Sequence, residues 1–538
     1  MRALNRIPPG ILRFLILFAI CGLVIFPAIY YGEFLQWDDD KNLYKNPWLL
    51  EGDVLRFWTE KFYFLLYIPV TYTVWTALWH LWSSAIAFHL LSLSLHAINS
   101  HFVYIIARRL YPELSARGLW MVTLTFALMP LQIEAFAWIS GGRDLLALTF
   151  SLWAVHVFLN SSKKTALAAS VLLFALGLLS KPTVAPLPVA LLALTRFRQS
   201  LHRQRWVTLA IWLGLAVLDL AWNRYVQDYG LDANVASVPF MNRIIVTLDA
   251  LGFYASKIAV PYQLNADYAR TPWRLMSEKL YLSTLPALAL ATGGLIAIYR
   301  KFKISTLDFI LFFLIGLSPV LGFIPFMAQA QSTVADRYVY WPWIAFSILI
   351  GIIVNRSQFA FKIMAAVLII WAGVGFHRSL AWRTDDILFS DMLEKSPESF
   401  TANNALGAFA FQRGDYAEAE IKLKKAHSLM PHRAGVASNL VQLYWIMNKR
   451  EAIRKEIEPL IYDGNWVKAN SAEYIPLSVL FLVVGRLDKV EGRFASANEN
   501  FCKAYALFPD NFSAKLEIMR SLEEIKTKSG RVTNCIHR

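Results

Sequence analysis

A succession of long apolar runs is the feature that most constrains this chain. The runs lie near residues 11–31, 84–107, 119–139, 144–160, 165–181, 183–196, 206–224, 281–299, 305–325, 337–354 and 359–377. An α-helix needs roughly 20 apolar residues to cross the hydrocarbon core of a bilayer, so the pattern predicts about eleven spans. The composition agrees, because hydrophobic residues make up 57% of the chain and charged residues 17%. These values exclude a disordered chain, a collagen-like chain and a single soluble enzyme.

Charged residues divide the chain into two parts. Residues 1–377 hold 30 Lys and Arg against 18 Asp and Glu, and the much shorter stretch 378–538 holds 23 against 20. We therefore predict a membrane domain over 1–377 and a polar domain over 378–538. Basic clusters of the membrane domain fall in predicted loops of one side, which the positive-inside rule makes cytoplasmic. This assignment places the tail on the extracytoplasmic side and accounts for the basic excess without a nucleic-acid partner.

The apolar segment 243–260 is not counted among the spans. It carries Asp249 and Lys257, and a span there would place the basic cluster at 300–303 on the wrong side. We therefore predict an interfacial or re-entrant helix for this segment.

The polar tail carries a repeated pattern of small residues. One copy has Leu406, Gly407, Gly414, Ala419, Ala426 and Pro431, and a second has Gly485, Gly492, Ala497, Ala504 and Pro509. Small residues let two helices approach closely and proline ends the second helix, as in tetratricopeptide repeats. The chain is therefore predicted to be all-α, with a membrane helical bundle followed by a short tetratricopeptide-type α-solenoid. Such a solenoid suits an extended peptide, although a capping or assembly domain without a ligand is the alternative.

An acidic triplet, Asp38, Asp39 and Asp40, follows the first apolar run directly after Trp37. Crowded carboxylates raise one another's pKa, so their proximity has an energetic cost. One interpretation is a solvated acidic turn, or an N-cap for a short helix at 41–50. The other is a general base at the membrane–water boundary that deprotonates a hydroxyl acceptor.

Further charged residues lie at predicted outer ends of spans, on the side of Asp38. They are Glu134, Arg143, Asp144, Lys181, Asp267, Arg270, Asp336 and Arg337, the last followed by Tyr338 and Tyr340. Each alone could be an interfacial anchor or a structural ion pair. Their convergence on one side favours a functional set, because ionisable residues at membrane depth are functional candidates and Arg and Lys suit a phosphate.

Together these residues resemble the transmembrane and tetratricopeptide-containing O-mannosyltransferase family, within the wider class of multispan C-type glycosyltransferases. The stretches that carry the resemblance are Trp37-Asp38-Asp39 followed by Asn46, 130–145 with Glu134 and Arg143, Ser180-Lys181, 261–268 with Asp267, and Arg337-Tyr338-Val339-Tyr340. They follow the family's order through most of the membrane domain. A departure is Pro182, since the family often has a carboxylate after the Ser-Lys pair.

The resemblance implies transfer of mannose or another hexose from a polyprenyl-phosphate donor, with inversion, to a hydroxyl on the outer face. The acceptor would be Ser or Thr of a protein or peptide held by the repeats. The family's acidic pair corresponds to Asp38 and Asp39, which leaves open which of them is the general base. Glu134 would be a second acidic group near the acceptor or donor.

The same resemblance assigns the substrate-binding residues. Arg143, Lys181 and Arg337 would lie on the phosphate side, and Asp267 and Tyr338 would complete the substrate contacts. It implies metal-independent transfer without a cofactor, although the acidic triplet could hold a divalent cation. The histidines of 84–107 favour satisfied polar groups between helices over a metal site.

A membrane-anchored scaffold, catalytically inactive and recruiting partners through its repeats, is the alternative from another functional class. The short tail favours a bacterial inner membrane with the repeats in the periplasm, and an endoplasmic reticulum membrane is topologically equivalent. In either compartment Cys502 and Cys535 could pair.

Overall fold

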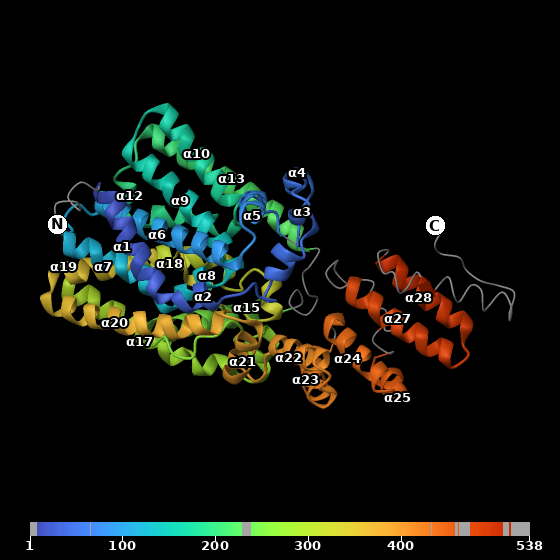
Figure 1. The fold of residues 1–538 in the computed structure, drawn as a ribbon. Helices are drawn as coiled ribbons and strands as arrows, with labels where there is room; N and C mark the ends of the chain where they lie inside the picture. Colours follow the sequence, from blue (N-terminus) through green and yellow to red (C-terminus); the bar gives the residue numbers. More distant parts are fainter. Residues whose placement is uncertain are drawn as a thin grey trace. The chain divides into compact units, whose positions relative to one another are not determined.

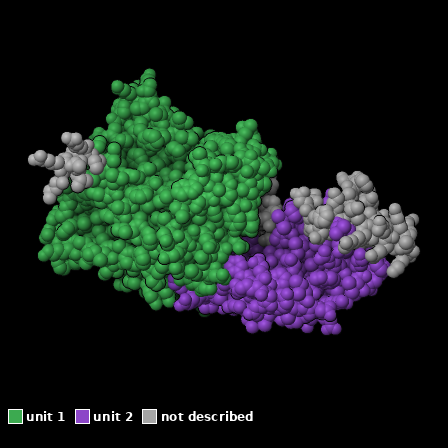
Figure 2. All heavy atoms as spheres, in the orientation of Figure 1, with its two compact units in different colours: residues 1–391 green, residues 392–538 purple. Residues whose placement is uncertain are grey.

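A computed structural model of the chain describes residues 8–64, 66–228, 238–431, 433–457, 461, 474–508 and 516–517. These residues form helices and turns, and their pairing of β type is limited to an isolated bridge between Tyr63 and Leu66. The all-α prediction is therefore confirmed for the part of the chain that is described. The molecule divides into two compact units, residues 1–391 and 392–538 (Figures 1 and 2).

The division falls after the boundary at residue 377 that the charge pattern predicts. Residues 378–391 belong to the first unit because they contact the loop after the first apolar helix. The backbone N–H of Glu33 donates to the carbonyl of Arg383 at 2.9 Å, and the N–H of Gln36 donates to Asp385 at 2.7 Å. The ring of Phe389 meets Trp37 edge to face. These backbone contacts join segments far apart in the sequence, so charge counting could not find them.

Five helical segments among the described residues are long and apolar enough to cross a membrane. They are Ala85–Leu110 (α6), Ile139–Asn160 (η4 and α9), Arg203–Val226 (in α13), Leu280–Phe302 (η6 and α17) and Gln358–Trp382 (α20 and η10). The bent pair Ala116–Leu128 (α7) and Pro130–Ala137 (η3 and α8), with an angle of 49°, gives up to six.

The remaining predicted spans coincide with shorter apolar helices. These are Pro9–Val24 (α1), Lys164–Leu178 (α10), Pro182–Ala193 (η5 and α11), Thr306–Val320 (α18 and η7) and Ile344–Arg356 (α19). Prolines explain several short lengths, since a proline lacks an N–H and interrupts the helical hydrogen bonds. Pro182, for example, begins a separate turn after α10. The count of eleven spans therefore stays a prediction.

The remaining elements of the first unit lie between these helices or follow them. They are Phe26–Tyr31 (α2), the π-helical turn Asp40–Tyr44 (η2), Pro47–Leu50 (α3), Val54–Thr59 (α4), Pro69–Leu81 (α5), Thr195–Arg198 (α12), Phe240–Ala259 (α15), Pro272–Ser277 (α16), Met327–Ala330 (η8), Asp336–Val339 (η9) and Asp385–Lys395 (α21). Helices α6 and α9 bury most of their apolar residues, and α13 and α17 expose most of theirs. We expect the exposed helices to face lipid.

Helix α15 covers the segment that the sequence excludes from the spans, and it is not among the candidate spans. Its Asp249 is fully buried. The guanidinium of Arg270 donates to both oxygens of Asp249, and the hydroxyl of Thr284 donates to one of them at 2.9 Å. A buried charge is tolerated when it is paired and hydrogen-bonded in this way. The pair ties α15 to the loop that carries Asp267. An interfacial or re-entrant position stays a prediction.

After its C-terminal end, α7 is followed by a chain of short turns, η3, α8 and η4, across residues 130–141. Pro130 begins this stretch, and Gly141 near its end packs against backbone. A Cβ at Gly141 would lie 2.5 Å from the carbonyl oxygen of Ala135, so only glycine fits there. The turns bring Glu134, Trp138 and Ser140 into one compact region before Gly142–Asn160 (α9) begins.

The tail contains two similar helical hairpins. Phe400–Gln412 (α22) pairs with Tyr416–Leu429 (α23), and Tyr474–Val490 (α27) pairs with Phe494–Leu507 (α28). Both turns use a glycine with positive φ, Gly414 at +82° and Gly492 at +80°, a conformation that side chains rarely adopt.

Between the two hairpins lie Ala434–Ile446 (α24), Arg450–Ala452 (α25) and the π-helical turn Ile453–Ile457 (η11). The alanines that the pattern singles out are buried. Pro509 and Cys535 lie outside the described residues, and a tetratricopeptide solenoid stays a prediction.

We predict that Gly485→Ala destabilises the tail by about 1–3 kcal/mol, the usual cost of overpacking. An added Cβ would lie 2.6 Å from the ring of the buried Phe501. The measurement is the urea midpoint for proteolytic cleavage of the tail in the full-length protein. Gly435→Ala is the control, because its nearest neighbour, Pro476, is 4.0 Å away. Equal midpoints for the two variants would contradict the close helix packing.

Candidate functional site

The two consecutive aspartates of the first loop, Asp38 and Asp39, lie in different surroundings. Asp38 has φ 74° and its side chain is 37% exposed, whereas Asp39 is fully buried. The left-handed conformation is uncommon outside glycine, although Asp and Asn tolerate it better than most residues. This backbone turn separates the two carboxylates, so Asp38 is open to solvent and Asp39 is enclosed.

Every contact of the Asp39 carboxylate comes from a hydrogen-bond donor. The backbone N–H of Leu35 donates to one oxygen at 3.0 Å. The backbone N–H and the hydroxyl of Ser140 donate to the other, at 2.9 and 2.5 Å. Burial raises the pKa of Asp39 to about 7, and the three hydrogen bonds oppose the rise. Asp39 therefore fixes the first loop onto the turns at 130–141.

The hydroxyl of Ser140 belongs to a longer chain of hydrogen bonds. The amide of Asn42 donates to it at 3.2 Å, and the phenol of Tyr72 donates to the amide oxygen of Asn42 at 2.8 Å. All of these groups are buried. A satisfied buried network of this kind holds its members rigidly, so the first loop has a defined shape around Asp38.

Glu134 and Arg337 form the central ion pair. The carboxylate of Glu134 accepts from the backbone N–H of Arg337 at 2.9 Å and also from its guanidinium. Because one residue binds both oxygens, the geometry of the pair is fixed.

The indole of Trp138 stands between two cations. The guanidinium carbons of Arg143 and Arg337 both lie 5.3 Å from its ring centroid. Its N–H donates to the carbonyl of Trp37 at 2.8 Å, next to Asp38. Cation–π contact with one ring therefore places both arginines near the acidic loop.

A third cation completes the group. Lys181 donates to Asp144 at 2.5 Å, and the hydroxyl of Thr183 donates to the same carboxylate at 3.3 Å. Lys181 also interacts electrostatically with Arg143 and Arg337. The three cations therefore lie within electrostatic range of one another, each beside a carboxylate.

The pair of Arg143 with Asp38 is the loosest of the three. Its closest atoms, Nη2 and Oδ2, are 3.6 Å apart, which is long for a hydrogen bond. The Nε atom of Arg143 is buried and has no hydrogen-bond partner among the described residues. A buried N–H without an acceptor is costly.

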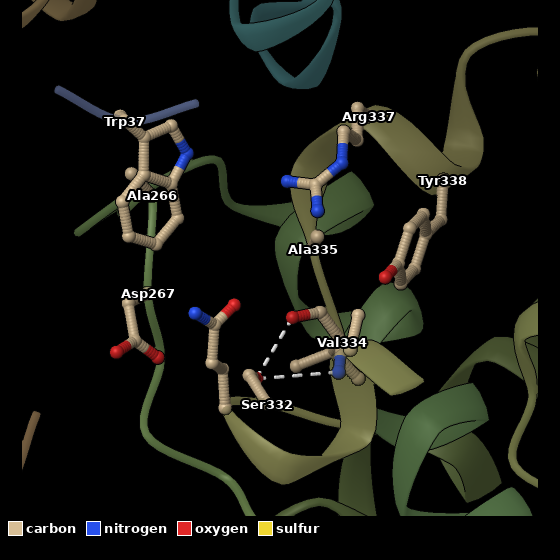
Figure 3. Close-up of a pocket in the computed structure, with 10 residues that line it drawn as sticks. Trp37, Ala266, Asp267, Ser332, Val334, Ala335, Arg337 and Tyr338 are labelled. Atoms are coloured by element: carbon tan, nitrogen blue, oxygen red, sulfur yellow. Dashed lines mark hydrogen bonds between the residues drawn. The ribbon is translucent and has the colours of Figure 1, made fainter. Parts of the chain in front are cut away.

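A narrow pocket opens beside these charges (Figure 3). Trp37 and Asp267 stand on one side, and Arg337 and Tyr338 of η9 stand on the other. Gln331 and Ser332 line it as well, and the hydroxyl of Ser332 bonds the backbone of Val334. Asp267 is buried, and one of its oxygens accepts from the N–H of Ala269 at 2.7 Å.

The structure thus gathers every candidate that the sequence singles out for catalysis or binding. They are Asp38, Asp39, Glu134, Arg143, Lys181, Asp267, Arg337 and Tyr338. Their chemical roles stay predictions. Sequence reasoning missed Asn42, Trp138 and Ser140, which organise the charged groups. Trp138 and Ser140 lie in the same short stretch as Glu134. The sequence signal that could have identified them is a polar or indole side chain among turn residues next to a charged candidate.

Metal binding finds no support among the described side chains. They contain no group of three or more His, Cys, Asp or Glu placed to hold a metal ion. His96 is engaged with the hydroxyl of Tyr340 at 2.9 Å and the carbonyl of Ala127 at 3.1 Å. A structural role for this histidine agrees with the sequence interpretation. Whether the reaction uses a metal or cofactor is untested.

Comparison with known proteins bears on the general class of the whole chain. No protein-family model matches the chain. A curated relative is a protein O-mannosyl-transferase of Caenorhabditis elegans, 24% identical over 443 residues. The match covers 78% of this chain and 63% of the relative, so the chain spans less than two thirds of the relative's length.

The buried Asp39 predicts a pH-dependent stability. Its pKa of about 7 in the folded protein lies above the 3.8 of an ordinary aspartate, so protonation favours the folded state. This contribution is complete below about pH 4 and is lost as the pH rises through 7. We expect the melting temperature of the wild type to fall relative to that of Asp39→Asn over that range. Other titrating groups are the same in both proteins, so the comparison cancels their effect. A difference in melting temperature that does not change with pH would contradict the raised pKa of Asp39.

Proposed function

We propose that this protein transfers a hexose from a polyprenyl-phosphate donor to a hydroxyl acceptor, with Asp38 as the general base. The similarity to a protein O-mannosyl-transferase supports a membrane glycosyltransferase in general. The apolar helices are compatible with a membrane protein. Mannose is the first sugar to test because the relative's name specifies it, and Ser or Thr of a protein is the first acceptor.

The observation that carries the proposal is the pairing of Asp38 with Arg143. Asp38 is more exposed than Asp39, and its closest approach to Arg143, 3.6 Å, is longer than a hydrogen bond. A carboxylate open to solvent can receive an acceptor hydroxyl, and the arginine can receive a phosphate oxygen. Asp39 suits the base role less well, because three donors already occupy its carboxylate.

The proposed step is a single displacement at the anomeric carbon. Asp38 takes the proton of the acceptor hydroxyl as its oxygen forms a bond to that carbon. The bond between the carbon and the phosphate oxygen breaks, and polyprenyl phosphate leaves with the electron pair. Attack opposite the leaving group inverts the anomeric configuration.

The three cations suit the negative charge that develops on the leaving phosphate. Arg143 and Arg337 are held by the indole of Trp138, and Lys181 is held by Asp144. Cations already oriented before the reaction stabilise the transition state without reorganising. Their carboxylate partners keep the site nearly neutral until the donor arrives. Glu134 positions Arg337 in this arrangement.

The tail supplies the proposed acceptor site. Its helical hairpins resemble the repeats that present a concave surface to extended peptides. Cys502 is engaged in a disulfide, which is typical of oxidising compartments. We therefore place the tail outside the cytoplasm, in the periplasm of a bacterium or the lumen of the endoplasmic reticulum.

We predict that Asp38→Asn lowers transfer by about 100- to 10,000-fold, the usual contribution of a general base. The assay uses purified full-length protein and a radiolabelled polyprenyl-phosphate hexose. Ser/Thr peptides and host membrane extract serve as acceptors. Asp53→Asn is the matched control, because Asp53 is an exposed N-cap whose hydrogen bond asparagine preserves.

Full activity of Asp38→Asn would exclude Asp38 as the base. A folded wild type that transfers no sugar from any donor would favour the catalytically inactive scaffold. A partner that then co-purifies through residues 404–509 would identify what the scaffold recruits.

We further predict that Arg143→Lys lowers kcat/KM for the donor by about 10- to 100-fold. Lysine keeps the positive charge but lacks the planar fork that binds two oxygens. Hydrogen bonds to a charged group contribute about 1.5–3 kcal/mol, which corresponds to that loss. Arg196→Lys, at an exposed pair with Glu113, is the control. An unchanged kcat/KM for Arg143→Lys would remove this residue from donor binding.

A further inference from the structure

A second cavity lies on the same outer loop as Asp38 but contains none of the site residues. It is lined by Trp58, Thr59, Glu60, Lys61, Tyr67 and Trp222, and its volume is about 400 Å³. This is within the range of small-ligand sites. The loop segment and the end of α13 both contribute to it. The hydroxyl of Tyr63 donates to the carbonyl of Lys41 at 3.1 Å, which joins the segment to the turn after Asp38.

Two aromatic rings of the cavity are fixed by hydrogen bonds at their polar ends, and the third, Trp222, is fixed by ring contact. The indole N–H of Trp58 donates to the hydroxyl of Thr73 at 3.0 Å. The hydroxyl of Tyr67 donates to the carbonyl of Trp58 at 3.2 Å, and its ring meets Trp222 edge to face. The two indoles remain 39% and 40% exposed. The cavity therefore offers ring surfaces whose orientation is set before any ligand arrives.

The polar groups of the cavity are balanced in charge. Glu60 and Lys61 are exposed neighbours, and neither has an ion-pair partner among the described residues. A carboxylate beside the ammonium disfavours an anionic ligand such as a phosphate. Carboxylate, ammonium and the hydroxyl of Thr59 together can donate to and accept from hydroxyl groups.

We propose that this cavity is a second saccharide-binding site that takes a neutral hexose unit. A pyranose has an apolar face of C–H groups and a rim of hydroxyls. The negative faces of aromatic rings attract the positive edges of such C–H groups. The two indoles suit the apolar face, and Glu60 and Lys61 suit the rim. The site would retain a chain that already carries a sugar while the transfer site acts elsewhere on it.

A membrane-interface belt is the other origin of exposed tryptophans. It accounts for Trp222 near the end of a candidate span. It does not account for a cavity that sets two indoles beside a carboxylate and an ammonium. A saccharide site explains all of these groups together. Its test does not depend on the proposed transfer activity, because binding is measured without a sugar donor.

The test measures binding of neutral disaccharides, mannobiose, maltose and lactose, to full-length protein in phosphatidylcholine nanodiscs. Detergents with sugar headgroups are avoided because they would compete. Saturation-transfer NMR gives the Kd for each sugar. We expect at least one sugar to bind, and Trp58→Ala and Trp222→Ala each to weaken it at least about tenfold, or about 1.4 kcal/mol. Trp58→Phe, which keeps a ring, should retain most of the affinity.

Trp273→Ala is the matched control, since Trp273 is 77% exposed and lies outside the cavity. Absence of binding to the wild type, or binding that survives loss of both indoles, would overturn the proposal. Phosphatidylcholine bound through Trp58 and Trp222, with no saccharide bound, would instead make the cavity a lipid-headgroup site and also overturn it.

Discussion

The buried carboxylate of Asp39 is the group on which the arrangement of the site depends. A carboxylate without water needs donors, and Asp39 finds them on Leu35 and Ser140. These bonds join the first loop to the turns before α9. They also require the backbone to reverse at Asp38, which therefore turns its own carboxylate outward. In the proposed mechanism, a residue that does not contact the substrate thus determines which aspartate can.

The charged groups beside Asp38 are likewise stabilised by pairing. Cations near a membrane are expensive unless they are paired, so Arg143, Lys181 and Arg337 each have a carboxylate neighbour. Removing one partner would leave an uncompensated charge and disturb the remaining pairs. The distance between the charged atoms differs from pair to pair, and this difference bears on the proposed chemistry. The loose pair of Asp38 and Arg143 can open for substrates, whereas the close pairs preserve the geometry.

The second cavity adds a different kind of surface to the same loop. One of its indoles is oriented by a hydrogen bond and the other by ring contact, and its charges are balanced, whereas the proposed transfer site is rich in charge. The two proposed sites differ in polarity and lie on one loop, which suits a molecule that is partly phosphate and partly sugar, or a chain that carries a sugar already. The paired helices of the tail are a third surface, proposed above to hold a polypeptide.

The sequence alone determines the helical class, the apolar runs and the small-residue pattern of the tail, because helix formation and burial depend on local periodicity. It also identifies the charged candidates, since ionisable residues at the ends of apolar runs are rare. It cannot assign partners. Glu134 and Arg337 are 203 positions apart, and Asp39 and Ser140 are 101 apart. Only tertiary packing decides such pairs, the different burial of Asp38 and Asp39, and the end of the first unit, because each depends on contacts between distant segments.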